Sequence, residues 1–315
     1  MKRSHANLLL LLAGAIWGMG FVAQSSAMDS IGPYLFIALR FAVASLVILP
    51  LTLLESRRQR FAANSADKDS QLSAGCGLGV RNCLKFVVIG LCLFAGMATQ
   101  QVGLLTTSVT NSGFLTGLYV VFTPVLGVLL YRSHPHPMTW VAALLSLLGI
   151  YFLSGGALGQ LVKGDILTIF SAMFWGLQVV LIARFAGESG RPLALSQIQF
   201  TITALLALLV ALVIEPIEWS GILEAAPQIL YAGIFASGFA FTIQVIGQRY
   251  TSAPQAAIFL SVEAPFAALF AFIFLSEKIS VIGFLGCALI LVAVLSVELV
   301  PQWQARRKNH IVENY

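Results

Sequence analysis

The chain has 315 residues, of which 58% are hydrophobic and only 10% are charged, with a formal net charge of +5 and a mean hydropathy of +0.90. Soluble domains carry about 25% charged residues, so this composition excludes an ordinary soluble protein. It also lacks the polar bias of a disordered chain, the cysteine density of a disulfide scaffold and the basic surface of a nucleic-acid-binding protein. The sequence therefore predicts a membrane protein with no nucleic-acid partner.

Apolar stretches recur along the chain, each with the roughly 20 residues needed to cross about 30 Å of hydrocarbon. We predict an all-α integral membrane protein whose partner is the lipid bilayer. A polar cytoplasmic loop is expected at 55–85 and a cytoplasmic tail at 300–315. The ten transmembrane helices are predicted near residues 8–28, 33–54, 86–105, 111–131, 138–156, 165–184, 194–214, 227–247, 254–275 and 279–299.

The Lys and Arg residues predict the orientation, because cytoplasmic loops hold most of them. With the N-terminus inside, 15 of the 18 are cytoplasmic, whereas Lys163 and Lys278 lie outside and Arg40 lies within the second span. The opposite orientation would leave two inside and 15 outside. We therefore expect a multi-pass protein of a bacterial cytoplasmic (inner) membrane with both termini cytoplasmic.

The first span allows a second interpretation, a cleavable signal peptide. Lys2 and Arg3 would be its charged start, and Ser25-Ser26-Ala27 offers a cleavage site. A spanning helix is favoured, because the apolar run is long and its Trp-Gly pair recurs in the second half of the chain.

The second half of the chain repeats the first. The two halves, 1–156 and 157–315, hold five spans each, and because five is odd they enter the bilayer from opposite sides. Inverted repeats of this kind build many secondary transporters, whose substrate binds near the midplane. A shift of 144 positions pairs Gln100 with Gln244, Gly103 with Gly247, Thr107 with Thr251, Ser108 with Ser252 and Phe122 with Phe266, and slightly larger shifts pair Trp17 with Trp175 and Arg40-Phe41 with Gln199-Phe200.

Several short motifs follow one another along nearly the whole chain: Ala15-Ile16-Trp17-Gly18, Leu39-Arg40-Phe41, Thr-Ser before the fourth and ninth spans, Pro265, and Leu275-Ser276-Glu277-Lys278. Their order resembles the EamA-type branch of the drug/metabolite transporter superfamily. The chain departs from that pattern at Ser133, where the family often has Glu, and in the following His-Pro-His-Pro turn. The resemblance implies two five-helix bundles around a central cavity, peripheral fifth and tenth helices, and export of amino acids or other small metabolites.

Two ionisable residues lie deep within predicted spans, which marks a functional site or a paired structural charge. Glu263 is close to the middle of the ninth span. Burial disfavours its charged form, so we hypothesise that it binds a cation or carries a coupling proton. Arg40 could bind a substrate carboxylate through two hydrogen bonds. The alternative for both is a structural role, including a salt bridge between them.

Polar side chains at helical spacing predict the remaining wall of a cavity. The two matched tryptophans, Trp17 and Trp175, could stack a substrate or hold a cation, and an interfacial position is their alternative. Tyr119 and Glu263 occupy equivalent positions of the repeat. The predicted substrate-binding residues are Trp17, Gln24, Arg40, Gln100, Thr116, Tyr119, Trp175, Gln178, Gln244 and Glu263.

No motif predicts a cofactor, a metal site or an enzyme. His134 and His136 lie in a turn without metal-ligand spacing, there is no phosphate-binding GxxxxGK[ST] loop, and neither HExxH nor GxSxG occurs. We expect a monomer or homodimer that moves a small-molecule substrate by alternating access. The alternatives are a flippase for a lipid-linked substrate and a partner-dependent membrane protein. Reduced thiols without CxxC spacing are expected at Cys76, Cys83, Cys92 and Cys287.

Overall fold

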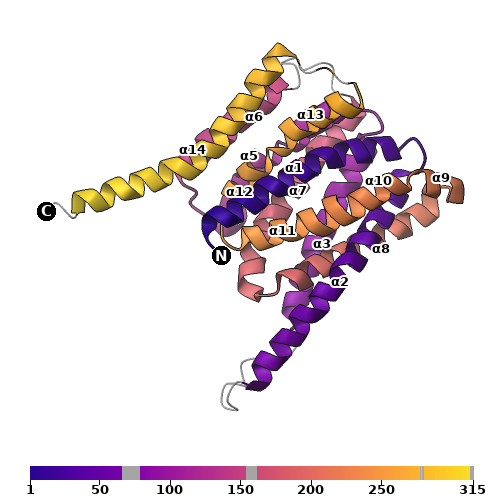
Figure 1. Ribbon diagram of the computed structural model, residues 1–315, viewed down its shortest axis with the longest axis horizontal. Coiled ribbons are helices and arrows are strands. Elements are labelled where there is room, and N and C mark those ends of the chain that lie inside the picture. Colours follow the sequence, from indigo (N-terminus) through magenta and orange to yellow (C-terminus); the bar gives the residue numbers. More distant parts are fainter. Residues whose placement is uncertain (66–78, 154–161, 277, 279, 313–315) are drawn as a thin grey trace.

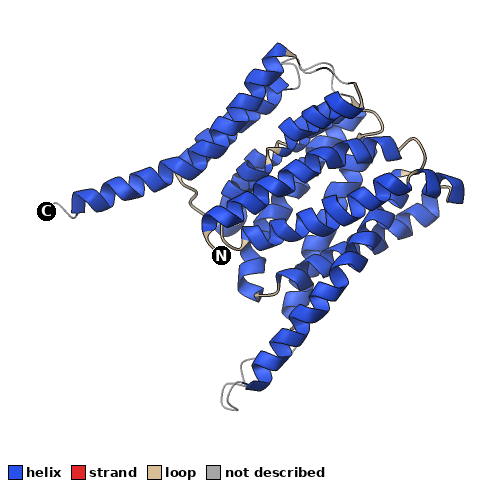
Figure 2. Ribbon diagram, in the orientation of Figure 1, coloured by secondary structure: helices blue, strands red, loops and turns tan. Residues whose placement is uncertain are grey.

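The computed structural model describes residues 1–65, 79–153, 162–276, 278 and 280–312. Within these ranges the regular structure is helical, without a strand (Figure 2). In chain order the helices are α1 (Arg3–Ala27), α2 (Pro33–Ser65), α3 (Val80–Gly103), α4 (Val109–Thr116), α5 (Tyr119–Tyr131), α6 (Pro137–Leu153), α7 (Lys163–Ser189), α8 (Pro192–Ile214), α9 (Trp219–Glu224), α10 (Ala226–Tyr231), the π-helix η2 (Ala232–Phe239), α11 (Ala240–Gln248), α12 (Ala253–Leu260), α13 (Glu263–Phe274) and α14 (Val281–Val312).

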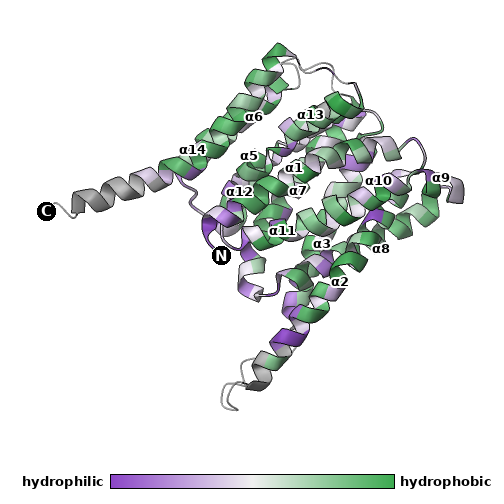
Figure 3. Cartoon of the chain, in the orientation of Figure 1, coloured by the Kyte–Doolittle hydropathy of each residue, from purple (hydrophilic) through white to green (hydrophobic). Residues whose placement is uncertain are grey.

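Nine helical segments of the described chain are long and apolar enough to cross a membrane, and α6 is a shorter apolar helix of 17 residues. Apolar residues cover the bundle, whereas polar residues gather at helix ends (Figure 3). The prediction of an all-α membrane protein of about ten helices is therefore confirmed. The first predicted span is α1, which packs against α11, α12 and α13.

The helix that contains the second predicted span, α2, continues past residue 54 into the predicted loop, ends at Ser65 and projects from the bundle (Figure 1). Leu, Glu, Arg and Gln are good helix formers, so the helix continues after the apolar residues end. The predicted tail is likewise helical as far as Val312. Residues 66–78 of the predicted loop, including Asp67, Lys68 and Cys76, lie outside the described residues, and its last residues from Val80 onward are the start of α3.

The spans predicted at 111–131 and 254–275 are each interrupted. α4 ends at Thr116 and α5 begins at Tyr119, while α12 ends at Leu260 and α13 begins at Glu263. In the second interruption, Pro265 lacks the N–H that would continue the α-helical hydrogen bonds. The two interruptions are 144 positions apart, which is the shift that relates the two halves of the sequence.

The helices pack in pairs. α2 packs along α8, α3 along α7, and α1 against α11 and α13, around a core of buried apolar side chains. α6 and α14 lie side by side at one edge of the bundle (Figure 1). Their backbones approach closely at Gly149 and Gly286, where a Cβ added to either would clash with the other, as expected for small residues between membrane helices.

A carboxylate accepts hydrogen bonds from the N-terminus of each of the two helices α2 and α8. Glu55 of α2 caps α8, and Glu215, which follows α8, caps α2. The backbone N–H groups of Leu193 and Ala194 donate to Glu55 at 3.2 and 3.1 Å. At the other end, the second and third residues of α2 donate to Glu215 at 2.8 and 2.7 Å. A carboxylate at a helix N-terminus satisfies free N–H groups and complements the helix dipole. The two helices are thus joined across their whole packed length.

Candidate functional site

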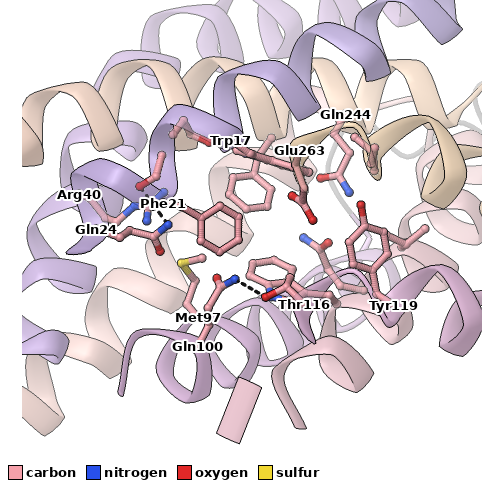
Figure 4. A pocket seen from close by; sticks show the side chains of 17 residues that line it. Trp17, Phe21, Gln24, Arg40, Met97, Gln100, Thr116, Tyr119, Gln244 and Glu263 are labelled. Atoms are coloured by element: carbon pink, nitrogen blue, oxygen red, sulfur yellow. Dashed lines mark hydrogen bonds between the residues drawn. The ribbon is translucent and has the colours of Figure 1, made fainter. Parts of the chain in front are cut away.

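A cavity lies between the helices of the bundle (Figure 4). It contains about 480 Å³ of space free of protein atoms, part of which is continuous with the outside. Its lining comes from α1, α2, α3, α4, α5, α7, η2, α11, α12 and α13, and so from both halves of the sequence. The edge helices α6 and α14 contribute none of these described lining residues.

All ten residues predicted from the sequence line this one cavity. The lining residues that the sequence analysis missed are apolar or glycine, and an apolar residue in a span could equally face lipid. For two of them the repeat offered a clue, because Met97 and Phe241 are equivalent positions, three residues before the equivalent glutamines Gln100 and Gln244. The missed residues are Gly20, Phe21, Met97, Val179, Ala236, Phe241 and Leu260.

Phe241 is the centre of an aromatic cluster on the cavity wall. Its ring centroid lies 4.6 Å from that of Trp17 and 5.7 Å from that of Trp175, and the latter pair is stacked with an interplanar angle of 21°. Behind it, Phe41 and Phe200 lie 6.1 and 6.2 Å away. This cluster offers a flat apolar surface whose ring faces also attract cations.

Arg40 is almost completely buried, with 1% of its surface exposed. Its Nε donates to the hydroxyl of Ser237 at 2.9 Å, and its guanidinium carbon lies 5.6 and 5.3 Å from the ring centroids of Phe36 and Phe41. No described carboxylate forms an ion pair with it, and Nη1 has no hydrogen-bond partner among the described residues. The salt bridge with Glu263 that the sequence left open is therefore not formed. A buried charge without a counter-charge is unfavourable, so Arg40 presents a strong anion-binding group.

Glu263 and Tyr119 occupy equivalent positions in the two halves of the sequence, and their side chains face each other in the cavity (Figure 4). Each is the first residue of the half-helix that follows an interruption. Both are buried, and the two side chains lie close enough to interact with each other, although neither the Tyr119 hydroxyl nor Oε1 of Glu263 forms a hydrogen bond of good geometry within the described chain. The interruptions thus place a carboxyl and a phenol deep in the bundle with polar atoms still free to bind.

Glutamines supply most of the remaining polar atoms. Gln100 donates to the hydroxyl of Thr116 at 2.9 Å, and Gln178 donates to Gln199 at 3.2 Å. The side-chain oxygens of Gln24, Gln178 and Gln244 have no partner among the described residues. Most buried polar groups in proteins are hydrogen-bonded, so these acceptors, which share one cavity, are available to a ligand that enters it.

Close backbone packing fixes the interrupted helices against α1 and α7. A Cβ added to Gly18 would lie 2.4 Å from Cβ of Phe266, and one added to Gly176 would lie 3.0 Å from Cβ of Phe122. Each glycine therefore seats the half-helix that carries Glu263 or Tyr119. The contact on one half mirrors that on the other, because the positions are related by the repeat.

Among the described residues, no group of three or more His, Cys, Asp or Glu side chains is placed to hold a metal ion. His136 accepts a hydrogen bond from the backbone of Met138. Cys83, Cys92 and Cys287 are free thiols, and Cys76 lies outside the described residues.

The profile of the EamA-like transporter family matches residues 5–155 and 162–299. The chain belongs to this family. A protein of Archaeoglobus fulgidus that is named an uncharacterized transporter is 31% identical over 299 residues, which cover 95% of this chain and 87% of the relative. The uncharacterized transporter YwfM of Bacillus subtilis is 25% identical, over 96% and 97% of the two chains. The EamA resemblance predicted from sequence motifs is thus confirmed.

A solved structure shares the fold of this EamA chain. A crystal structure at 19% identity superposes with a TM-score of 0.75 and covers 96% of this chain and 99% of the other. This likeness concerns the fold alone. Together with the family, it places the cavity within the fold of a multi-pass membrane transporter.

Proposed function

We propose that this protein is a secondary transporter that carries a small metabolite, an amino acid or a related amine, through the central cavity by alternating access. One observation carries the proposal: polar and aromatic side chains from both halves converge on one cavity with buried polar atoms left free. A cargo that offered complementary groups would satisfy them. The free atoms are Oε1 of Gln24, Nη1 of Arg40, the hydroxyl of Tyr119, Nε1 of Trp175, and Oε1 of Gln178, Gln244 and Glu263.

The two charged residues support a zwitterionic cargo. The guanidinium of Arg40 can bind a carboxylate through two parallel hydrogen bonds. The carboxylate of Glu263, with the amide oxygen of Gln244 beside it in the cavity, can accept from an ammonium group. The aromatic cluster around Phe241 would contact the apolar part of the cargo.

The mechanism that we propose uses two inverted repeats, 1–156 and 157–315, that move against each other. The equal spacing of the two helix interruptions supports it, and so does the pairing of α1 with α13 and α7 with α5 at repeat-related positions. Interrupted helices at the interface of inverted repeats are typical of substrate sites in secondary transporters. The excess of Lys and Arg on one side supports cytoplasmic termini in a bacterial inner membrane, and export is the direction that we propose.

Proton coupling is part of the proposal and assigns one role to Glu263. The charged carboxylate would hold the ammonium group of the cargo, and protonation would release it. Burial of this carboxyl, with 4% of the residue exposed, supports a side chain that can exist in both forms.

Counterflow in proteoliposomes tests the proposal. Vesicles are loaded with one unlabelled compound at a time, and accumulation of its labelled form is recorded for amino acids, amines and small sugars. We expect accumulation for a small set of related amino acids or amines. Absence of counterflow for every compound, with folded and inserted protein, would overturn the proposal. Empty vesicles, and loaded vesicles without the protein, are the controls.

A further inference from the structure

The two repeat-related tryptophans of the cavity differ in the hydrogen bonding of the indole nitrogen Nε1. Trp17 and Trp175 occupy equivalent positions of the repeat, 158 residues apart, and both line the cavity and contact the ring of Phe241. Nε1 of Trp17 donates to the backbone oxygen of Ala236 at 2.8 Å. Nε1 of Trp175 has no hydrogen-bond partner within the described residues.

The difference coincides with the π-helix η2, which occurs in the second half of the described chain. Ala236 lies within η2, one of the segments in which a helix departs from regular α-helical hydrogen bonding. The segment related to η2 by the shift of 144, residues 88–95, lies within α3, which is a regular α-helix. Trp17 therefore has a backbone acceptor that the other half does not provide for Trp175.

The ring of Trp175 is nevertheless held firmly. It stacks on Phe241, and it packs so closely on Gly96 that a Cβ added there would lie 3.3 Å from the ring. Only 8% of the residue is exposed. The direction of its N–H group is therefore fixed by packing, and a buried donor without an acceptor is unfavourable.

We propose that the indole N–H of Trp175 donates a hydrogen bond to an oxygen of the cargo and so determines specificity, whereas that of Trp17 is structural. This inference rests on the proposed transport function. It requires a cargo with an acceptor oxygen, a carboxylate, carbonyl or hydroxyl, within reach of Trp175. A site that offers a fixed donor discriminates against analogues that lack the acceptor.

Kinetics of single-atom variants test the inference. Trp175→Phe keeps an aromatic ring and removes the N–H, so the KM of the compound found by counterflow should rise about 3- to 10-fold. The same variant should not change the KM of an analogue that lacks the acceptor oxygen. Trp17→Phe should instead lower the melting temperature, because the bond to Ala236 is lost. Trp219→Phe, at an exposed position outside the cavity, is the control for both measurements.

Indole NMR gives a second readout that a merely structural role would not change. The five tryptophans are labelled with ¹⁵N and their indole resonances assigned by Trp→Phe variants. Addition of the transported compound should move the indole proton of Trp175 downfield, and by more than that of Trp17, which already donates to Ala236. Transport with an unmoved Trp175 resonance and an unchanged KM in Trp175→Phe would overturn this inference alone. Absence of transport for every compound would overturn the proposed function, and this inference with it.

Discussion

The α2–α8 contact and the cavity both contain polar side chains among apolar helices, but these side chains differ in the extent of their hydrogen bonding. Along the contact, Ser45, Thr52, Glu55, Thr201 and Glu215 all have hydrogen-bond partners, most of them on the facing helix; we call these residues the seam. In the cavity, polar atoms on seven side chains have none within the described chain. Satisfied groups hold helices together, whereas unsatisfied groups at a cavity are available to a ligand. We therefore expect changes in the seam to alter stability, and changes in the cavity to alter transport.

The largest expected effect is on transport by Arg40→Met. The variant removes the anion-binding group, so counterflow should fall at least about 100-fold, as for loss of a charged buried hydrogen-bond partner. It also removes a buried charge without a counter-charge, so the melting temperature should stay the same or rise. Arg40→Lys tests the requirement for two parallel hydrogen bonds and should recover little transport. Normal counterflow by Arg40→Met would show that the cargo does not use this charge.

The next effect is on stability, at the seam. Glu215→Ala leaves two backbone N–H groups of α2 without their acceptor, so the free energy of unfolding should fall by about 1.5–3 kcal/mol. Transport per folded molecule should persist. Unfolding in a detergent titration measures the first quantity and counterflow the second. Glu218→Ala is the matched control, because that side chain is exposed and does not cap its helix. Loss of transport at unchanged stability would break the proposed division between seam and cavity.

The apolar helices could be predicted because the thickness of the bilayer sets their length. The polar cavity residues could be predicted because a polar side chain within a span is costly and therefore marks a site or a structural partner. The seam could not be predicted. Glu55 and Glu215 lie at the ends of apolar runs, where carboxylates are ordinary, and their partners are 138 to 181 positions away in sequence.

The helix interruptions and the apolar cavity residues could not be predicted from the sequence either, for related reasons. The helix interruptions keep the apolar composition of the span, so hydropathy does not reveal them. The apolar cavity residues, such as Phe241, have the same composition as a lipid-facing surface. In both cases the difference depends on contacts with distant helices, and the repeat gave the available clue.

A smaller effect concerns pH and belongs to the cavity. In the proposed cycle the carboxylate of Glu263 holds an ammonium group, so cargo affinity should fall as the pH falls and the carboxyl takes up a proton. Glu263→Gln can neither gain nor lose that proton, so its KM should be high and independent of pH. Tyr119→Phe is the comparison, because it removes the facing hydroxyl and keeps the carboxyl. A pH-dependent KM in Glu263→Gln would assign the coupling proton to another group.

The smallest effects separate hydrogen bonding from location. Ser45 and Ser112 are both serines of apolar helices, but the Ser45 hydroxyl lies 3.0 Å from that of Thr201, whereas the Ser112 hydroxyl has no partner within the described residues. Ser45→Ala removes the contact with Thr201 and the acceptor of the Gln197 amide, so it should lower the free energy of unfolding by about 0.5–1.5 kcal/mol for each of these two hydrogen bonds. Ser112→Ala removes a buried hydroxyl that gains nothing from its surroundings, so stability should be unchanged or higher. Unfolding of the two variants in the same detergent series compares them directly. If Ser112→Ala lost as much stability as Ser45→Ala, unpartnered atoms in this fold would be satisfied in some other way. The free polar atoms of the cavity would then no longer distinguish a binding site from ordinary packing.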